Sequence, residues 1–251
     1  MSAFDLSGLT AVVTGARRGI GSGIAEALAA AGADIVGVSS TLEADGGDIG
    51  ARVRAHGREF RGLAADFADA AAVADLGDAL AELAPDILVN NAGTIRRAPA
   101  AEHPLDWWNE VVQVDLTSQF QLTQAVGRGM LERGRGKVIF TASLLSFQGG
   151  INVPGYAAAK SGISGLTKAL ANEWAAGGVN VNAIAPGYIA TENTRALQDD
   201  PDRSRGILER IPAGRWGRPA DLGGAAVFLA SPASDYVSGV VLPVDGGWLG
   251  R

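Results

Sequence analysis

Short runs rich in β-branched residues alternate along this chain with longer stretches rich in alanine and leucine. The first two runs, TAVVTG at 10–15 and DIVGVSS at 34–40, are almost continuously apolar, and the stretch at 19–32 between them reads as a helix. Apolar strands without alternation are typical of a sheet that is buried on both faces. The pattern therefore predicts a parallel sheet with helices on both sides and right-handed crossovers.

The same alternation continues to the C-terminus. Further strands are expected at 57–66, 86–93, 136–143, 179–187 and 238–247, and helices at 71–84, at 104–132 and around YAAAK at 156–160. Because no linker or break in composition divides the chain, we predict one Rossmann-type, doubly wound α/β domain over residues 1–251, with about seven strands. The poorly patterned stretch at 188–212 is expected to be a substrate lid.

Composition excludes several classes of function. The net charge of −6 disfavours nucleic acid and anionic membrane surfaces as partners. The chain has no cysteine and only two histidines, so disulfides and thiolate metal sites are impossible, and we expect no metal. The N-terminus lacks the layout of a signal peptide, and no apolar run is long enough to span a bilayer. A cytoplasmic protein with a small-molecule substrate is expected.

A glycine-rich stretch, TGARRGIG at 14–21, joins the first expected strand to the first expected helix. Gly15, Gly19 and Gly21 would let the backbone turn sharply and approach a pyrophosphate, which the N–H groups of the helix N-terminus would bind. The alternative is a tight turn without a ligand. The position after the first strand of a βαβ unit favours a dinucleotide.

The end of the second strand usually decides between the two nicotinamide cofactors, because an acid there binds the ribose 2′-hydroxyl and an arginine accepts a 2′-phosphate. Here the position holds Ser39, followed by Ser40. Glu43 could reach back as an acceptor, and Arg17 and Arg18 could meet a phosphate or be ordinary solvated charges. The residues themselves leave NAD and NADP both open.

The chain places Lys160 four positions after Tyr156, although it contains only three tyrosines. Residues at this spacing share one face of a helix. A phenol has a pKa of about 10 in water, too high for a base at neutral pH. A nearby ammonium lowers that pKa by roughly 1–3 units, so Tyr156 could exchange a proton with an alcohol. The alternative makes Tyr156 a core aromatic and Lys160 a surface charge.

Several motifs occur together in one order: TGARRGIG, NNAG at 90–93, Ser143 thirteen positions before Tyr156, YAAAK, and PGYIAT at 186–191. This arrangement closely resembles the short-chain dehydrogenase/reductase family over nearly the whole chain. Further stretches such as LLSFQGG, IPAGRWGRPADL and VFLASPASDYVSG resemble a subgroup that acts on 2-dehydro-3-deoxygluconate and related sugar acids. The resemblance therefore implies a hydride-transferring oxidoreductase.

The same resemblance assigns roles to individual residues. Ser143 would orient the reacting oxygen, Tyr156 would exchange its proton, and Lys160 would bind the nicotinamide ribose. Asp66 would hydrogen-bond the adenine, or cap a helix, or do both. The implied cofactor site consists of Gly15, Arg18, Gly19, Ile20, Gly21, Ser39, Asp66, Phe67, Asn90, Ala92, Gly93, Tyr156, Lys160, Pro186, Gly187, Ile189 and Thr191. The subgroup slightly favours NAD.

One residue departs from the family pattern. Asp115, in VVQVDLTSQF, stands where the family commonly has an asparagine whose main-chain carbonyl holds a water near the lysine. We include Asp115 among the catalytic residues. If buried near Lys160, its carboxylate would hold the lysine protonated and oppose formation of tyrosinate. The alternative is a tolerated replacement, in which case Asp115→Asn keeps at least about a tenth of the activity.

The substrate site is less constrained than the cofactor site. Arg97 follows NNAG, and an arginine can grip the carboxylate of a sugar acid through two hydrogen bonds. With Arg97, Ser143 and Tyr156, Gln148 is a predicted substrate contact, and Trp216 is a further candidate. Each has a plainer alternative: a solvated loop residue for Arg97 and Gln148, and a packing anchor for Trp216.

The sequence is also compatible with rival functions. The same chemistry could serve a 3-oxoacyl thioester or a neutral sugar, and a non-catalytic protein that senses dinucleotide redox state is an alternative of another class. The family commonly forms homotetramers through its two long helices and its C-terminal segment. The apolar run VSGVVLPVDGGWL suits such a contact, and packing of the last strand explains it nearly as well.

Overall fold

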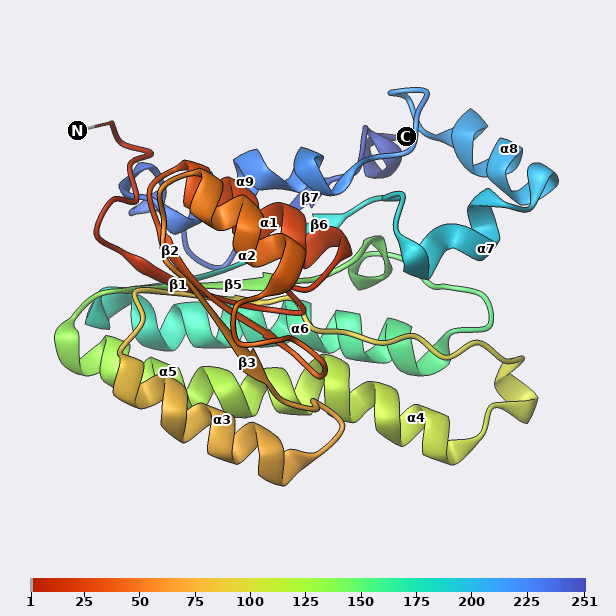
Figure 1. Ribbon diagram of the computed structural model, residues 1–251. Coiled ribbons are helices and arrows are strands. Elements are labelled where there is room, and N and C mark those ends of the chain that lie inside the picture. Colours follow the sequence, from red (N-terminus) through yellow and green to blue (C-terminus); the bar gives the residue numbers. More distant parts are fainter. Residues whose placement is uncertain (1) are drawn as a thin grey trace.

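The computed structural model describes residues 2–251, and one parallel sheet runs through it (Figure 1). The strands lie in the order β3-β2-β1-β4-β5-β6-β7, and each neighbouring pair is parallel. Their bounds are β1 (Thr10–Thr14), β2 (Asp34–Ser39), β3 (Phe60–Ala64), β4 (Ile87–Asn90), β5 (Gly136–Thr141), β6 (Val179–Pro186) and β7 (Val241–Val244). The predicted doubly wound α/β architecture is confirmed.

Helices cover both faces of the sheet. One face carries α1 (Gly19–Ala30), α2 (Gly47–Ala55) and α9 (Gly223–Ala230), and the other carries α3 (Ala70–Leu83), α5 (Ser118–Arg133) and α6 (Pro154–Trp174) (Figure 1). The helix α4 (Leu105–Val112) leads into α5 and packs beside α6. Two shorter helices, α7 (Arg195–Gln198) and α8 (Pro201–Arg210), follow β6 beyond its carboxyl end.

Alternate residues of each strand feed two separate cores. Val13 of β1 belongs to the same core cluster as Ile24 and Leu28 of α1. Its neighbour Val12 points to the opposite face, in the cluster that contains Phe140. Both members of such a pair are fully buried, so the strands read as continuous apolar runs instead of an alternating pattern. The absence of alternation was therefore the correct signal for a sheet covered on both faces.

Local sequence explains where the helices begin and end. The carboxylate of Asp69 accepts hydrogen bonds from Ala71 N and Ala72 N at the start of α3. Pro154 begins α6, at a position where a backbone N–H would have no acceptor within the helix. Gly134 ends α5 with a φ of 67°, a conformation that glycine adopts without strain. The helices that flank the site are thus fixed by their own sequences.

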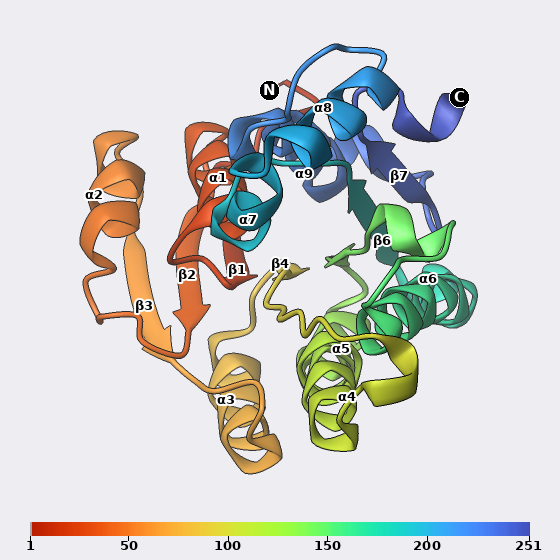
Figure 2. The same cartoon turned by 90° about the vertical axis from the view of Figure 1, so that its right-hand side faces the viewer.

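The order of the strands creates one crevice. The chain runs outward from β1 through β2 to β3, then returns to place β4 on the other side of β1. The loops after β1 and β4 therefore leave the carboxyl edge of the sheet in opposite directions, and ligands bind at such a switch point. Figure 2 looks onto this end of the molecule, with α7 and α8 above the ends of β1 and β4.

Some elements differ from the sequence-based expectations. The helices α2 and α9 were not predicted, and the helix expected at 104–132 contains a π-helical turn at Gln113–Thr117. The stretch at 188–212, expected to be a substrate lid, contains α7 and α8, which its poor pattern did not predict. Within residues 2–251, no helix has both the length and the apolar character needed to cross a membrane.

Candidate active site

A cavity of about 770 Å³ opens at the switch point, where the glycine-rich loop forms one wall. Gly15 and Gly19 have φ values of 67° and 60°. A Cβ atom on Gly21 would collide with the carbonyl of Gly15, and one on Gly15 would lie 2.8 Å from Asn91 Nδ2. The first turn of α1 has no side-chain cap, so its N–H groups are available to an anion.

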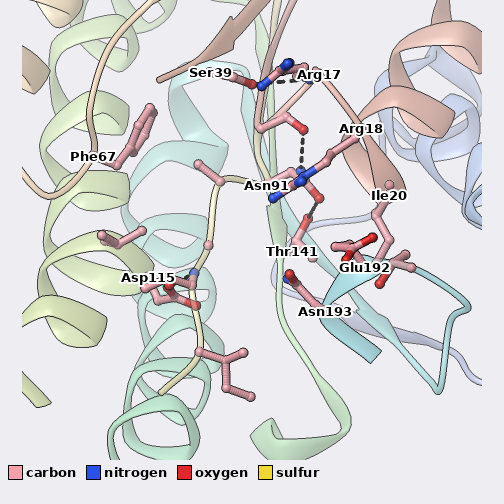
Figure 3. Close-up of a pocket in the computed structure, with 18 of the residues that line it drawn as sticks. Arg17, Arg18, Ile20, Ser39, Phe67, Asn91, Asp115, Thr141, Glu192 and Asn193 are labelled. Atoms are coloured by element: carbon pink, nitrogen blue, oxygen red, sulfur yellow. Dashed lines mark hydrogen bonds between the residues drawn. The ribbon is translucent and has the colours of Figure 1, made fainter. Parts of the chain in front are cut away.

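A small hydrogen-bond network joins this loop to the loop after β4. The buried hydroxyl of Thr14 accepts hydrogen bonds from Asn91 N and Ala92 N, each at 2.9 Å. Asn91 Nδ2 donates to Thr14 O at 3.0 Å. Figure 3 shows the neighbouring bond, in which Thr141 Oγ1 donates to Asn91 Oδ1 at 3.3 Å. The carboxyl ends of β1, β4 and β5 are therefore held together at the cavity wall.

The end of β2 carries no acid toward the cavity. Ser39, Ser40 and Thr41 line it, and the guanidinium of Arg17 donates to Thr41 Oγ1 at 2.7 Å. Arg17 N also donates to Ser39 Oγ at 3.2 Å, and Arg18 lines the same wall (Figure 3). This corner of the cavity is positively charged and rich in hydroxyl groups.

The residues predicted around the adenine also line the cavity. Asp66 and Phe67 both do so, and Asp66 Oδ1 accepts a hydrogen bond from Ala68 N at 2.9 Å. The alternative role of Asp66 as a helix cap is wrong, because Asp69 caps α3. The second oxygen of Asp66 has no protein hydrogen bond among the described residues, so it is free to meet a ligand.

The opposite wall holds three ionisable side chains from two elements. Lys160 Nζ donates to Thr141 O at 3.0 Å, lies 3.2 Å from Asp115 Oδ2 and stands 5.5 Å from the centre of the Tyr156 ring. Asp115 comes from the π-helical turn before α5, and its Oδ1 accepts a hydrogen bond from Thr94 N at 2.7 Å. Figure 3 shows Asp115 at the cavity wall, across from Asn193.

Burial and charge act against each other in this cluster. Burial disfavours the charged form of Lys160, but the negative charges of the Asp115 carboxylate and of an ionised Tyr156 phenolate outweigh it and raise the pKa of Lys160. Burial raises the pKa of Asp115, and the Lys160 ammonium opposes that rise. We regard the pair as ionised, because one carboxylate oxygen of Asp115 accepts a backbone N–H and the other lies 3.2 Å from the Lys160 ammonium.

Ser143 follows β5 and begins the short 3-10 helix Leu144–Ser146. Its hydroxyl oxygen accepts a hydrogen bond from Leu145 N at 3.1 Å, which leaves the hydroxyl hydrogen free to donate. Ser146 Oγ donates to Lys160 O at 2.6 Å and so ties this turn to α6. The local fold thus brings Ser143 to the helix that carries Tyr156 and Lys160.

Two arginines after NNAG have different surroundings. Arg96 makes two hydrogen bonds of 2.8 Å with Glu110, so its guanidinium is already engaged. Arg97 is exposed and lines the cavity, and among residues 2–251 its guanidinium donates only to Asn193 O, at 3.3 Å. This long bond joins the loop after β4 to the segment that precedes α7, at the mouth of the cavity.

Not every predicted residue lies at the cavity. The lining includes Gly15, Arg18, Gly19, Ile20, Ser39, Asp66, Phe67, Ala92, Gly93, Arg97, Asp115, Tyr156, Lys160 and Thr191. It does not include Gly21, Asn90, Ser143, Gln148, Pro186, Gly187 or Ile189. Gly187 and Ile189 line a second, smaller cavity of about 270 Å³ between β6 and the residues that follow α8.

The side chains of Asn90 and Gln148 do not line the cavity, because each bonds to another part of the fold. Asn90 is fully buried, and its Nδ2 donates to Thr123 Oγ1 of α5 at 2.8 Å. Gln148 Oε1 accepts hydrogen bonds from Trp248 Nε1 at 3.3 Å and from Arg210. Gln148 therefore holds the C-terminal segment, and Trp216 is a packing residue whose ring meets that of Tyr188 edge-on.

The sequence did not single out several lining residues. Asn91, Thr94, Glu110 and Asn193 belong to the cavity wall. Asn91 stands next to the predicted Asn90, and only the side-chain direction at the end of β4 distinguishes them. Among residues 2–251, no group of three histidine, aspartate or glutamate side chains is arranged to bind a metal ion.

The chain matches known proteins over nearly its full length. A protein-family model described as "Enoyl-(Acyl carrier protein) reductase" matches residues 15–249. The 2-dehydro-3-deoxy-D-gluconate 5-dehydrogenase of Pseudoalteromonas atlantica is 59% identical over 250 residues, which cover 99% of this chain and 98% of that protein. The enzyme of the same name from Bacillus subtilis is 56% identical, with the same coverage of 99% and 98%.

A solved structure agrees with these relatives. It is a crystal structure, with bound NADP, of an Agrobacterium tumefaciens protein assigned as 2-deoxy-D-gluconate 3-dehydrogenase. That protein is 52% identical to this chain, and the two structures superpose with a TM-score of 0.95 over 100% of each chain. The match extends through the cavity walls and the segment that carries α7 and α8.

Proposed function

This chain belongs to the short-chain dehydrogenase/reductase family and is an oxidoreductase, and from that premise we propose that it transfers a hydride between NADP and a sugar acid. The reacting carbon of the substrate is a secondary alcohol in one direction and a ketone in the other. We propose 2-dehydro-3-deoxy-D-gluconate or 2-deoxy-D-gluconate, because similar proteins carry those names. The carrying observation is the buried Lys160 ammonium beside Tyr156 at the cavity wall.

The glycine-rich wall fits a dinucleotide pyrophosphate. Gly15 lines the cavity with its main chain, and a Cβ atom on Gly21 behind it would collide with the Gly15 carbonyl. The uncapped N–H groups of α1 and the positive end of its dipole face that surface. Nicotinamide cofactors, when bound, carry the hydride, and the chain supplies orientation and the proton.

Tyr156 is the proposed proton donor and acceptor. In alcohol oxidation its phenolate oxygen would accept the hydroxyl proton, and in ketone reduction its hydroxyl would return it. Lys160, whose ammonium lies 5.5 Å from the Tyr156 ring centre, stabilises the phenolate by its charge. The free hydroxyl hydrogen of Ser143 would donate to the substrate oxygen and orient it toward Tyr156.

We propose NADP as the preferred cofactor, although the subgroup resemblance slightly favoured NAD. Among the described residues, no carboxylate lines the corner at the end of β2, where the guanidinium of Arg17 bonds to Thr41 and its main-chain N–H bonds to Ser39. A 2′-phosphate suits that corner better than a bare hydroxyl. We expect Arg17→Ala to lower kcat/KM for NADP by at least about tenfold and to leave the value for NAD nearly unchanged.

Arg97 is the proposed ligand of the substrate carboxylate. It is the cavity-lining arginine whose guanidinium has only one long bond, to Asn193 O at 3.3 Å. A carboxylate could replace that bond with two charge-assisted hydrogen bonds. The segment from Thr191 through α8 would then be a lid that Arg97 holds at the cavity mouth.

We also propose a homotetramer. The exposed apolar side chains on α4 and α5 include Leu105, Trp107, Trp108 and Phe120, and α4 packs beside α6. An exposed apolar patch of this kind marks an interaction surface. Light scattering should report four chains per particle, and a monomer would contradict the assembly. Location in the cytoplasm stays a prediction from the sequence.

Steady-state rates test the proposal directly. The purified chain would be assayed with NADP and NAD against 2-dehydro-3-deoxy-D-gluconate, 2-deoxy-D-gluconate, D-gluconate, a neutral sugar and a 3-oxoacyl thioester. We expect the highest kcat/KM for one of the sugar acids. A preference for the thioester, in line with the description of the matched family model, would replace the substrate proposal. Cofactor binding without turnover of any compound would favour a sensing protein.

A further inference from the structure

Asp115 is a carboxylate enclosed beside the proposed proton-exchanging pair. Its exposed fraction is 0%, and that of Lys160 is 2%. One carboxylate oxygen, Oδ2, lies 3.2 Å from Lys160 Nζ, while the other accepts the Thr94 N–H at 2.7 Å. The π-helical turn at Gln113–Thr117 is the local irregularity that presents this side chain.

The surroundings of the carboxylate indicate that it is ionised. Oδ1 accepts the Thr94 N–H, and Oδ2, which makes no hydrogen bond among the described residues, lies in ion-pair contact with the Lys160 ammonium. Asp115 Oδ2 packs against Gly93, because a Cβ atom on Gly93 would lie only 3.1 Å from that oxygen. Lys160 donates in addition to Thr141 O at 3.0 Å, so its ammonium is fixed between the carboxylate and β5.

We propose that Asp115 is an ionised positioning residue that raises the pH at which Tyr156 and Lys160 lose their protons. The inference rests on the proposed function, because it concerns the same proton-exchanging pair. A buried negative charge opposes the removal of a proton from any neighbouring group. Asp115 therefore holds Lys160 as an ammonium and opposes the formation of a second negative charge on Tyr156.

This charge biases the two directions of the reaction differently. The protonated phenol is the form that donates to a ketone, whereas alcohol oxidation needs the phenolate. With Asp115 ionised, we expect alcohol oxidation to need a higher pH than it needs in Asp115→Asn. Without the charge, both ionisations move to lower pH, and oxidation becomes faster near neutrality.

Other charged groups face the same cavity and stay constant in the test. They are Glu110 of α4, Arg97 after β4, Arg17 and Arg18 of the glycine-rich loop, Asp66 after β3 and Glu192 before α7. Glu110 is held by Arg96, with two bonds of 2.8 Å. Among the described residues, Asp115 is the one carboxylate in an ion pair with Lys160.

The direct test is an optical titration of Tyr156 in the full chain. Tyrosinate absorbance is recorded against pH for the wild type, for Asp115→Asn and for the control Asp106→Asn, which removes an exposed carboxylate from the first turn of α4. In each background, subtracting the corresponding Tyr156→Phe spectrum isolates Tyr156. We expect its apparent pKa to fall by about 1 unit in Asp115→Asn and to stay constant in Asp106→Asn.

The kinetic counterpart is the pH profile of kcat/KM for alcohol oxidation, in which both limbs should move to lower pH in Asp115→Asn only. An unchanged or higher apparent pKa for Tyr156 overturns the proposal. The titration needs no turnover, so failure of the substrate proposal leaves this result readable.

Asp115→Ser, which retains an acceptor for Thr94 N, is the second variant. If neither variant folds, a protonated carboxyl band in the infrared spectrum of the neutral wild type overturns the inference, and its absence supports it.

Discussion

Replacing Thr14 by valine is predicted to destabilise the fold and to weaken cofactor binding together. The Thr14 hydroxyl accepts the N–H groups of Asn91 and Ala92 at 2.9 Å each, and it donates to Val89 O at 3.4 Å. Valine has the same shape but offers no acceptor. Two backbone N–H groups beside the cavity then lose their partner.

The size of the effect follows from those two groups. An unsatisfied N–H costs about 1–3 kcal/mol when buried, and both groups here are partly buried, so we expect a loss of about 2–4 kcal/mol in the free energy of unfolding. Thr167→Val is a matched control, since Thr167 is also fully buried but its hydroxyl only donates, to Ile163 O at 2.7 Å. The control should cost less than about 1 kcal/mol.

Denaturant unfolding at neutral pH measures both variants, and fluorescence titration measures cofactor affinity. The loop after β4 lines the cavity through Asn91 and Ala92, so Thr14→Val should raise the cofactor Kd, whereas Thr167→Val should not. A Thr14→Val protein as stable as the control would refute the reasoning that this hydroxyl holds the loop. If Thr14→Val loses the expected stability but keeps the wild-type cofactor Kd, the hydroxyl stabilises the fold without shaping the cofactor site.

Three further outcomes follow from the structure. Gly21→Ala should weaken cofactor binding by at least about tenfold in a fluorescence titration, since its Cβ would displace the carbonyl of Gly15, and unchanged binding would contradict the close fit. Arg97→Ala should raise KM for the sugar acid more than it lowers kcat, and an equal KM for acidic and neutral sugars in the wild type would argue against a carboxylate ligand. The pKa of Asp221 is lowered to about 2 by its hydrogen bonds to the Arg215 guanidinium and to Arg218 N. Because the pKa is lower in the folded state, the ionised carboxylate stabilises the fold at pH values above its unfolded pKa of about 3.9. The free energy of unfolding of the wild type should therefore exceed that of Asp221→Asn by about 1–2 kcal/mol at neutral pH. This difference should shrink as the pH falls from about 4 to 2. A pH-independent difference in unfolding experiments would contradict that assignment.

Local patterns were sufficient to predict the sheet and the glycine-rich wall. The apolar runs that became β1 and β4 are buried on both faces, and the loop after β1 contains glycines at positive φ, so each prediction depended on residues close together in sequence. The spacing of Tyr156 and Lys160 likewise needed only the period of a helix. These features follow from backbone geometry.

Other features depend on contacts that no short pattern contains. Gln148 bonds to Trp248, one hundred positions away, and this pairing removes it from the cavity. Asn90 and Asn91 are neighbours with the same chemistry, but the side chain of Asn90 points toward α5, where it bonds to Thr123, and that of Asn91 lines the cavity. The helix α2 has few apolar residues, so its sequence gave little periodic signal. Tertiary packing, not propensity, set each of these outcomes.

The proton-exchanging role of Tyr156 is the claim on which the proposed function depends, and Tyr156→Phe tests it most directly. The ring and its packing beside Lys160 are retained, so the cofactor Kd should change less than about twofold. General acid–base catalysis contributes about 10²–10⁴-fold, so kcat/KM for the sugar acid should fall by at least about a hundredfold. Turnover within about tenfold of the wild type would contradict the proposed proton chemistry.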